Sequence, residues 1–424
     1  MSSDTPPVVT TRFVRGLVHV SIVLVVAVVF LLQPLPAVNR RWCPETIHVG
    51  RRLNYLLNFD SPVYLDIAEK PSRLFLDHGE WRSRRARPLY MLAAWALTGA
   101  FRDVPGLRRM NPHPSYPAFI VLNLTILVLS LSLFTAIVGT SRRAWVLGTL
   151  LGILLFSNDV AKVFVWTPHQ QLFNIFEPLA CAWLVRHTAE RPTLSLQRLT
   201  CYGLAAGVLL LAYGSFVLLL AALLMGLFAR WRRGESGRHL LAGGGLASLA
   251  FGLPVLAWIL LVRHETGGFY VGETAEYRDF VWMVYAWRAG GARRLARVFV
   301  VFSADFLRTF GTEWVIPTFV VGAAVILRVT AWEATREVVR RRWPTLVACF
   351  TSFALNLLFF WLMGNYAPRL SFNILPPLLA AAAVVVAGVT EERTNKVWLS
   401  LLATVALFVG LAHFHVIAKL GPWC

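Results

Sequence analysis

The sequence predicts an all-α integral membrane protein with about eleven transmembrane helices, because apolar runs long enough to cross a bilayer recur along the whole chain. The 424 residues are 57% hydrophobic and only 15% charged, and the mean hydropathy is +0.60. A soluble protein of this size would need more polar surface. The net charge is +19, with Lys and Arg in short clusters between the apolar runs. This pattern favours membrane lipids and lipid phosphates as partners and argues against nucleic acid.

Each span is expected where an apolar run is bounded by charged or turn-forming residues. The predicted spans are 13–36, 117–139, 144–158, 171–186, 198–213, 214–230, 240–262, 312–329, 344–363, 372–389 and 397–416. The run from Leu199 to Phe228 is too long for one upright span, and Tyr213-Gly214-Ser215 interrupts it, so it is divided there. No repeat or linker is evident, and residues 1–424 are taken as a single membrane domain.

Positive charge in the connecting segments predicts the orientation of the chain. If the N-terminus is cytoplasmic, every short loop on the cytoplasmic side is basic, as the positive-inside rule requires. These loops contain Arg142 and Arg143, then Arg186 and Arg191, then Arg230, Arg232, Arg233 and Arg238, then Arg336, Arg340, Arg341 and Arg342, and finally Arg393 and Lys396. Two outer loops, 37–116 and 263–311, are also rich in Arg, but loops of this length translocate largely regardless of charge.

The long first outer loop is expected to contain amphipathic and interfacial helices. The apolar run from Pro88 to Phe101 has the length of an interfacial or re-entrant helix, and Arg84 and Arg85 before it are expected to contact lipid headgroups. Earlier in the loop, Asp60 lies at the membrane boundary and precedes a short amphipathic helix. Because Pro62 is a favoured first helical residue, Asp60 or Ser61 could serve only as an N-cap.

Four groups of residues follow one another in a recognisable order. Asp60, Tyr64, Ile67 and Ala68 are followed by Gly79-Glu80-Trp81, Arg87-Pro88-Leu89-Tyr90 and, near the C-terminus, Tyr366-Ala367-Pro368-Arg369-Leu370 with Leu375-Pro376-Pro377. These groups resemble motifs of the C-type (GT-C) glycosyltransferases, which include the protein O-mannosyltransferases and the lipid A aminoarabinose transferases. The first resembles the family's Asp-Glu-x-x-Tyr-x-x-x-Ala signature, with Ser61 in place of the second acid. Leu370 stands in place of the usual Tyr of the Pro-Arg-Tyr element.

This resemblance implies an enzyme that moves a monosaccharide from a polyprenyl-phosphate donor to a hydroxyl of a glycan, glycolipid or protein. It places the active site on the extracytoplasmic face of a bacterial plasma (inner) membrane. It implies that Asp60 is the general base, acting with inversion at the anomeric carbon. Arg369, and second Arg87, would stabilise the leaving phosphate, although lipid-headgroup snorkelling is an alternative for both.

Other side chains are candidates for substrate contacts: Tyr64, Asp66, Glu69, His78, Glu177 and Tyr366. Asp66 and Glu69 are three residues apart and share a helix face, so a divalent cation is possible there, with a surface carboxylate pair as the alternative. Glu177, at the outer end of a span, either orients the acceptor, pairs with Arg369, or marks a structural break before Pro178. His169, His78 and His264 are either proton carriers or surface histidines.

Three other classes of protein are compatible with a basic polytopic chain. A lipid or glycan transporter or flippase would place broken or charged spans in matched halves, and no matched halves are evident. A non-catalytic GT-C-like assembly subunit would keep the fold without needing Asp60. A polysaccharide polymerase or ligase of related fold would take a diphosphate donor.

Overall fold

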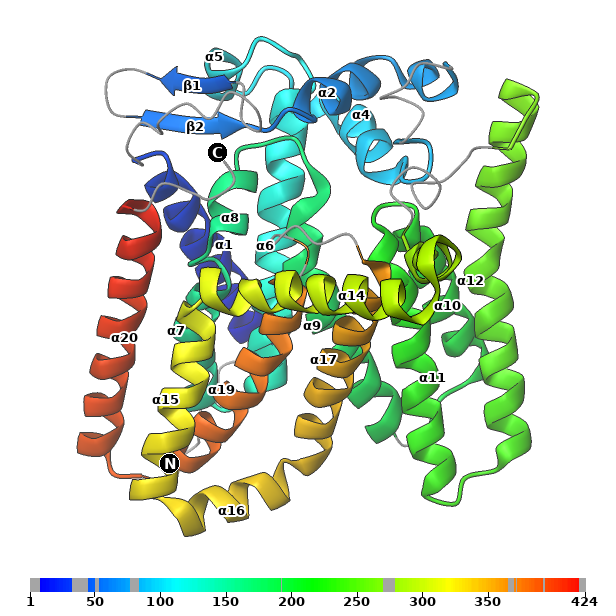
Figure 1. Ribbon diagram of the computed structural model, residues 1–424. Coiled ribbons are helices and arrows are strands. Elements are labelled where there is room, and N and C mark those ends of the chain that lie inside the picture. Colours follow the sequence, from blue (N-terminus) through cyan, green and yellow to red (C-terminus); the bar gives the residue numbers. More distant parts are fainter. Residues whose placement is uncertain are drawn as a thin grey trace.

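The protein is a bundle of long helices with a smaller cap of short elements at one end (Figure 1). A computed structural model describes residues 8–32, 45–49, 53–76, 84–191, 193–269, 279–364, 370, 372–391 and 393–418. The predicted all-α membrane architecture is confirmed, because apolar helices make up the whole body of the bundle.

A helix overlies each of the eleven predicted spans. In chain order these are α1 (Val8–Phe30), α6 (Tyr116–Val138), α7 (Arg142–Gly152), α9 (Phe173–Glu190), α10 (Leu196–Leu210), α11 (Val217–Arg232), α12 (Gly237–Thr266), α15 (Val315–Thr330), α17 (Trp343–Met363), α19 (Leu375–Glu391) and α20 (Asn395–Ala418). Among the described residues, seven candidate spans are long and apolar enough to cross a membrane, and they include α1, α6, α11, α12, α17, α19 and α20. An eighth is the pair α15 and α16 (Trp332–Arg341), bent by 117°.

The predicted division of the 199–228 run is confirmed. Helix α10 ends at Leu210, the short 3-10 helix η4 (Gly214–Phe216) follows, and α11 begins at Val217. At this break the chain reverses direction between α10 and α11. The break therefore determines at which end of the bundle every later loop lies.

The five basic loops all lie at the end of the bundle away from the cap (Figure 1). Their arginines tie neighbouring loops together. Arg143 donates to the carbonyl of Glu391 over 3.0 Å and to Asn395 Oδ1 over 2.6 Å. Arg342 forms an ion pair with Glu391 at 3.5 Å. The basic segment after α15 is the helix α16, which lies along this end of the bundle.

The cap consists of short elements from the segment 37–116, which was predicted to be the first outer loop. They are β1 (Glu45–Val49), β2 (Leu53–Leu57), α2 (Ser61–Glu69), the 3-10 helix η1 (Pro71–Phe75), α4 (Leu89–Phe101) and α5 (Leu107–Met110). The helix expected over residues 88–101 is α4. The antiparallel β1–β2 ribbon was not expected from the sequence, because so short a ribbon depends on tertiary packing for its stability. The Tyr55 hydroxyl supplies part of that packing by donating to the Met110 carbonyl over 2.7 Å.

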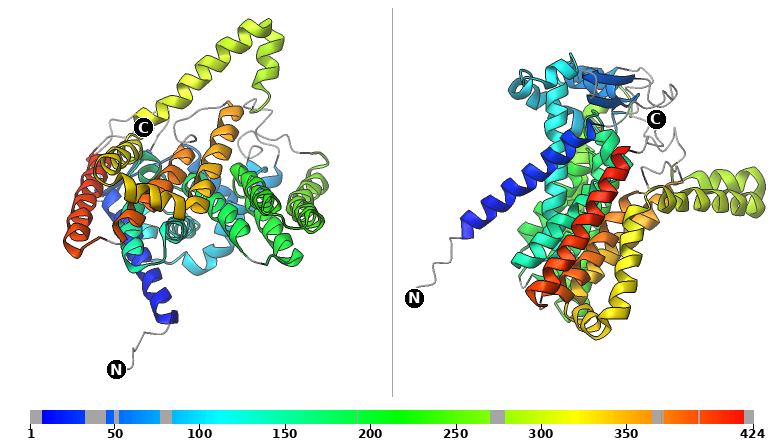
Figure 2. Two further views of the ribbon diagram at one scale, coloured as in Figure 1. Left: turned by 90° about the horizontal axis from the view of Figure 1, so that it is seen from below. Right: turned by 90° about the vertical axis from the view of Figure 1, so that its left-hand side faces the viewer.

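The remaining elements connect the spans. They are the 3-10 helices η2 (Ile153–Leu155), η3 (Gln170–Leu172) and η5 (Phe372–Ile374), together with α8 (Asp159–Phe164) and α14 (Trp282–Thr312). Helix α14 extends sideways from the bundle and is kinked at Gly290 and Gly291 (Figure 2). Gly291 has φ +60° and ψ −154°, a conformation that residues with a side chain rarely adopt.

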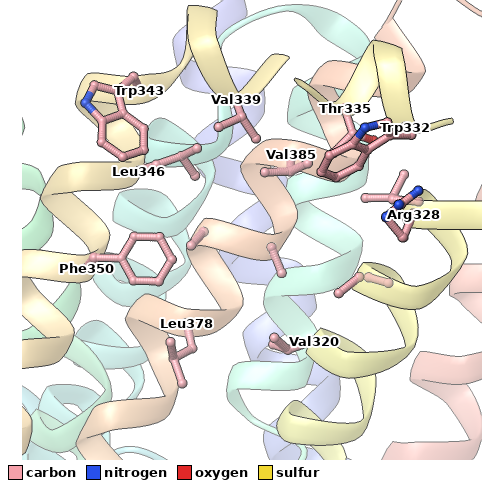
Figure 3. A pocket seen from close by; sticks show the side chains of 15 residues that line it. Val320, Arg328, Trp332, Thr335, Val339, Trp343, Leu346, Phe350, Leu378 and Val385 are labelled. Atoms are coloured by element: carbon pink, nitrogen blue, oxygen red, sulfur yellow. The ribbon is translucent and has the colours of Figure 1, made fainter. Parts of the chain in front are cut away.

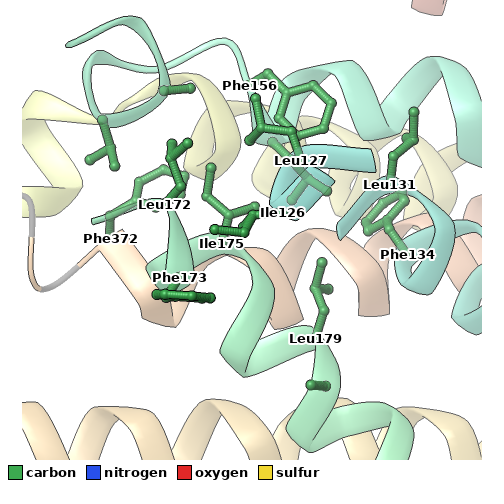
Figure 4. Packing of buried hydrophobic residues seen from close by; sticks show 14 of the residues in the cluster. Ile126, Leu127, Leu131, Phe134, Phe156, Leu172, Phe173, Ile175, Leu179 and Phe372 are labelled. Carbon is green, nitrogen blue, oxygen red and sulfur yellow. The ribbon is translucent and has the colours of Figure 1, made fainter. Parts of the chain in front are cut away.

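The centre of the bundle is packed around α6 and α9. Leu127, Leu131 and Phe134 of α6 are fully buried, as are Ile175 and Leu179 of α9 (Figure 4). Helix η3, which leads directly into α9, is held against this core and continues into the candidate site described below.

Helices α10 and α12 approach closely at two glycines. A Cβ atom on Gly203 would lie 2.1 Å from the Ala247 carbonyl oxygen, and one on Gly207 would lie 2.1 Å from that of Phe251. Small residues spaced by four are the usual means by which membrane helices bring their backbones together. The contact therefore depends on both glycines lacking a side chain.

We expect Gly207→Ala to destabilise the protein by about 1–3 kcal/mol, because the methyl group overpacks a contact that cannot expand without separating the helices. Gly252→Ala on α12 is the matched control, since nothing lies within 4 Å of its Cβ position. Thermal unfolding in detergent would measure both. Equal melting temperatures for the two variants would show that the α10–α12 contact is not tight.

Candidate active site

Asp60 lies between the ribbon and α2, where the cap meets the bundle. Its backbone is helical (φ −75°, ψ −20°), and its carboxylate accepts no hydrogen bond from the first turn of α2. Asp60 therefore occupies the expected N-cap position of α2, but its side chain does not cap the helix. The backbone is fixed instead by its own N–H, which donates to Asn58 Oδ1 over 3.0 Å. The carboxylate is left available for long-range partners.

Two side chains from distant parts of the chain converge on the Asp60 carboxylate. Arg84 forms an ion pair with Oδ1, and His169 Nε2 lies 3.3 Å from Oδ2. The side chains of Asp60, Arg84 and His169 are only 13%, 15% and 5% exposed. A carboxylate removed from water to this degree requires such charged and polar partners to remain ionised.

Tyr64, one turn along α2, supports this arrangement. Its hydroxyl accepts a hydrogen bond from Arg84 at 3.3 Å, and the Arg84 guanidinium carbon lies 5.0 Å from the centre of its ring. The ring is also 5.3 Å from that of His169. Tyr64 is fully buried, so it acts as a rigid support for both partners of Asp60.

Arg87 is held beside this cluster by the residue after His169. The Gln170 amide is oriented with its oxygen towards the guanidinium. This oxygen accepts a hydrogen bond from Arg87 at 2.9 Å, and the amide nitrogen donates to the Ala212 carbonyl. The guanidinium carbon lies 5.3 Å from the centre of the Tyr213 ring. Consecutive residues at the start of η3 therefore contact both Asp60 and Arg87.

Asn123 fixes the turn that presents His169. It is fully buried in α6 and donates to the carbonyls of Phe164 and Thr167 over 3.0 and 2.9 Å. It also accepts a hydrogen bond from the Tyr90 hydroxyl at 2.6 Å. Burial raises the pKa of Tyr90 well above its ordinary value, so the phenol stays a hydrogen-bond donor. One amide thus joins α4, α6 and the segment before His169.

The expectation that Arg84 and Arg85 contact lipid headgroups is wrong. Arg84 pairs with Asp60, as described above. Arg85 is buried and donates to the carbonyls of Leu74 and Leu76, each over 2.6 Å. The carbonyls at the end of η1 need donors, and Arg85 supplies them.

Asp66 and Glu69 do not form a joint cation site. Asp66 pairs with Arg73 at 2.8 Å, whereas Glu69 lies 2.7 Å from His113 Nδ1. Each carboxylate already has a basic partner of its own, so the two do not fit a shared divalent cation. Among the described residues no group of three or more His, Cys, Asp or Glu side chains is arranged to hold a metal ion.

Glu177 is fully buried inside the bundle. Its Oε1 accepts a hydrogen bond from the Cys181 thiol at 2.9 Å, and Ser215 and Asn356 lie beside the carboxyl group. Pro178 lies within the helix and does not end it, because α9 continues to Glu190. A role for Glu177 in binding substrate stays a prediction.

Several predicted residues lie outside the described part of the chain. They are His78, the Gly79-Glu80-Trp81 element, Tyr366 and Arg369. His264, in contrast, is exposed near the end of α12. The roles predicted for all these residues stay predictions.

Gln170 was not singled out from the sequence, and for His169 the contact with Asp60 was not foreseen. A surface position was the alternative for His169, yet its side chain is only 5% exposed and contacts Asp60. The available signal was the polar stretch Thr167-Pro168-His169-Gln170-Gln171 between two apolar runs. Polar residues in such a position inside a membrane protein are a functional-site signal.

We expect Asn123→Ala to lower the free energy of unfolding by about 1–3 kcal/mol, because buried carbonyls lose their donor. Thr125→Ala is the control on the same helix, since its exposed hydroxyl only donates within α6. Melting temperatures in detergent would show the difference. A Thr125 variant as unstable as the Asn123 variant would contradict this role.

The fold of this multi-pass membrane protein is similar to those of two solved membrane proteins of the GT-C type, ArnT and AglB, which confirms the predicted resemblance at the level of the fold alone. The chain is similar to ArnT from Cupriavidus metallidurans bound to undecaprenyl phosphate, with a TM-score of 0.52 and 13% identity over 92% of this chain and 62% of that one. For ArnT in the apo state the TM-score is 0.51 and the sequence identity is 14%, over the same shares of the two chains.

A second solved protein shares the fold. Archaeal oligosaccharyltransferase AglB from Archaeoglobus fulgidus, in complex with an inhibitory peptide and a dolichol-phosphate, matches with a TM-score of 0.50 and 12% identity, over 95% of this chain and 56% of that one. The chain thus spans less than two thirds of the length of ArnT and AglB. No family model and no curated protein matches the sequence.

Proposed function

We propose that this protein is an inverting glycosyltransferase that moves a monosaccharide from a polyprenyl-phosphate donor to a hydroxyl of a glycan, glycolipid or protein. The observation that carries the proposal is the Asp60 carboxylate, held at the boundary of the bundle by Arg84 and His169. The fold shared with ArnT, solved with undecaprenyl phosphate, and with AglB, solved with a dolichol-phosphate, supports a lipid-linked donor.

Asp60 would act as the general base. Each carboxylate oxygen can accept more than one hydrogen bond, so Asp60 can receive the acceptor's proton while it contacts Arg84 and His169. The acceptor oxygen forms a bond to the anomeric carbon as the bond from that carbon to the phosphate oxygen breaks. The proton passes to Asp60, and the polyprenyl phosphate leaves with the bonding electron pair. A single carboxylate suffices because phosphate is a good leaving group.

The leaving phosphate needs cationic donors, and Arg87 is the candidate among the described residues. Its guanidinium is oriented by Gln170 and Tyr213, and a planar fork of N–H donors matches two phosphate oxygens. Arg369 is the second candidate by sequence. The donor's lipid tail would lie between the spans, with its sugar next to Asp60.

The active site would face the extracytoplasmic side of a bacterial inner membrane. The cap with Asp60 and the five basic loops lie at opposite ends of the bundle (Figure 1). The positive-inside rule assigns the basic end to the cytoplasm, which leaves Asp60 outside. This orientation also agrees with a cap built from a long first loop.

We expect Asp60→Asn to reduce transfer by roughly 10²–10⁴-fold, the usual contribution of a general base. The measurement uses purified protein, a panel of radiolabelled polyprenyl-phosphate sugars, and an extract of native lipids and glycans. Asp103→Asn is the matched control, because that aspartate is also in the first loop but is 76% exposed and pairs with Arg108.

The same pair of variants separates the enzyme from its rivals. If the protein were a transporter, or an assembly subunit that does not catalyse transfer, cells with the Asp60→Asn variant would have the same phenotype as cells with the unaltered protein. Absence of Asp60-dependent transfer from every donor, by a protein that inserts and folds normally, would overturn the proposal. Transfer only from diphosphate-linked donors would identify a polymerase or ligase instead.

Arg87→Ala should raise the KM for the donor by roughly 10- to 100-fold, as expected for the loss of about 1.5–3 kcal/mol from a charged hydrogen bond. Arg102→Ala, an exposed position at the end of α4, should leave that KM unchanged. Initial-rate kinetics at varied donor concentration would measure both. If only the acceptor KM changed, Arg87 would not contact the donor.

A further inference from the structure

A groove opens between α15, α17 and α19 (Figure 3). It adjoins α16, at the end of the bundle opposite the cap (Figure 1). Its volume is about 340 Å³, and apolar side chains form most of its walls. Helix α16, which lies along the basic end of the bundle, closes the groove at that end. Phe350 and Trp343 are 51% and 57% exposed, so the groove lies on the outer surface of the helical bundle, where membrane lipid would contact it.

Small residues create this space. Ala323 and Ala324 of α15 and Ala381 and Ala382 of α19 line the groove, between larger side chains of the same two helices such as Leu327 and Leu378. The 117° bend between α15 and α16 turns the chain away before it could fill the gap. An unfilled apolar surface of this shape is suited to a hydrocarbon chain.

The basic end of the groove has the chemistry of a lipid-headgroup site. Arg328 lines the groove, and its guanidinium carbon lies 4.5 Å from the centre of the Trp332 ring. Trp and Arg are enriched where hydrocarbon meets headgroups. Arg340 and Arg342 pair with Glu337 and Glu391. In the part of the chain that the structure describes, no carboxylate forms an ion pair with Arg328.

We infer that the groove binds one anionic phospholipid from the leaflet at the basic end of the bundle, with an acyl chain against the alanines and its phosphate on Arg328. A lipid-linked sugar donor is the less suitable occupant, because its phosphate must lie at the opposite end, near Asp60. The positive charge of Arg328, which forms no ion pair with a described carboxylate, selects an anionic headgroup over a zwitterionic one. Only the exclusion of the donor lipid rests on the proposed function; the fit of an anionic phospholipid rests on the groove and Arg328.

Native mass spectrometry of the full-length protein tests the inference. Purified, delipidated protein is titrated with phosphatidylglycerol or with phosphatidylcholine of the same acyl chains. We expect one phosphatidylglycerol to be retained in preference to phosphatidylcholine. Arg328→Ala and Ala324→Phe should each weaken this retention by about tenfold or more, by removing the charge or filling the groove. Both positions are exposed, so both variants should fold.

Two control variants match these substitutions. Arg336→Ala removes a charge from α16, and Val321→Phe adds a ring to α15, but neither residue lines the groove. Both should bind phosphatidylglycerol like the unaltered protein. Equal binding by all variants, equal binding of the two lipids, or equal losses in the controls would overturn the inference. Displacement of phosphatidylglycerol by undecaprenyl phosphate at equal concentration would assign the groove to the donor lipid instead.

Discussion

The charge balance around the Asp60 carboxylate is the interaction on which the candidate site depends. A nearly buried carboxylate is stable only with close partners, and its partners Arg84 and His169 lie 24 and 109 residues further along the chain. The Arg84 ion pair lies within the segment 37–116, whereas the His169 contact connects that segment to the one that enters α9. The cap cannot move away from the bundle without losing the contact of His169 with Asp60.

Polar contacts behind the carboxylate extend this constraint into the core. Tyr64 supports Arg84 and His169, and Asn123 holds the carbonyls that precede His169. An unpaired polar group in an apolar interior costs about 1–3 kcal/mol, so each of these contacts favours one arrangement over nearby alternatives. The site is consequently positioned by rigid helices, which suits a reaction that needs a base and a phosphate group in fixed relation.

Hydropathy predicted most of the fold because the bilayer imposes a length on every apolar helix. The break at Tyr213-Gly214-Ser215 was sufficient to divide one long run correctly and so to bring the basic loops to one end. The β1–β2 ribbon was missed because its stability comes from contacts such as Tyr55 with Met110, which the local sequence does not reveal.

Prediction of the site was limited by long-range pairing. Asp60 and Arg87 were identified by motifs, but sequence spacing did not show that His169 would contact Asp60. The spacing of Asp66 and Glu69 suggested that they share one cation. They lie on the same helix, but they pair separately with Arg73 and His113. Arg84 and Arg85 are adjacent in sequence, but one contacts a carboxylate and the other caps η1. Chain proximity alone could not assign these partners.

A comparison of Asp60 with the buried Glu177 illustrates how environment favours one carboxyl group as the candidate base. Glu177 has hydrogen-bonding neighbours that are all neutral, namely Cys181, Ser215 and Asn356. Asp60 has the permanent positive charge of Arg84 on one oxygen and an imidazole near the other. A general base must be ionised before it can accept a proton. Among the described residues, an ionised Glu177 would have no counter-charge at ion-pair distance, whereas Asp60 has one, so electrostatics favours Asp60 over Glu177 as the base.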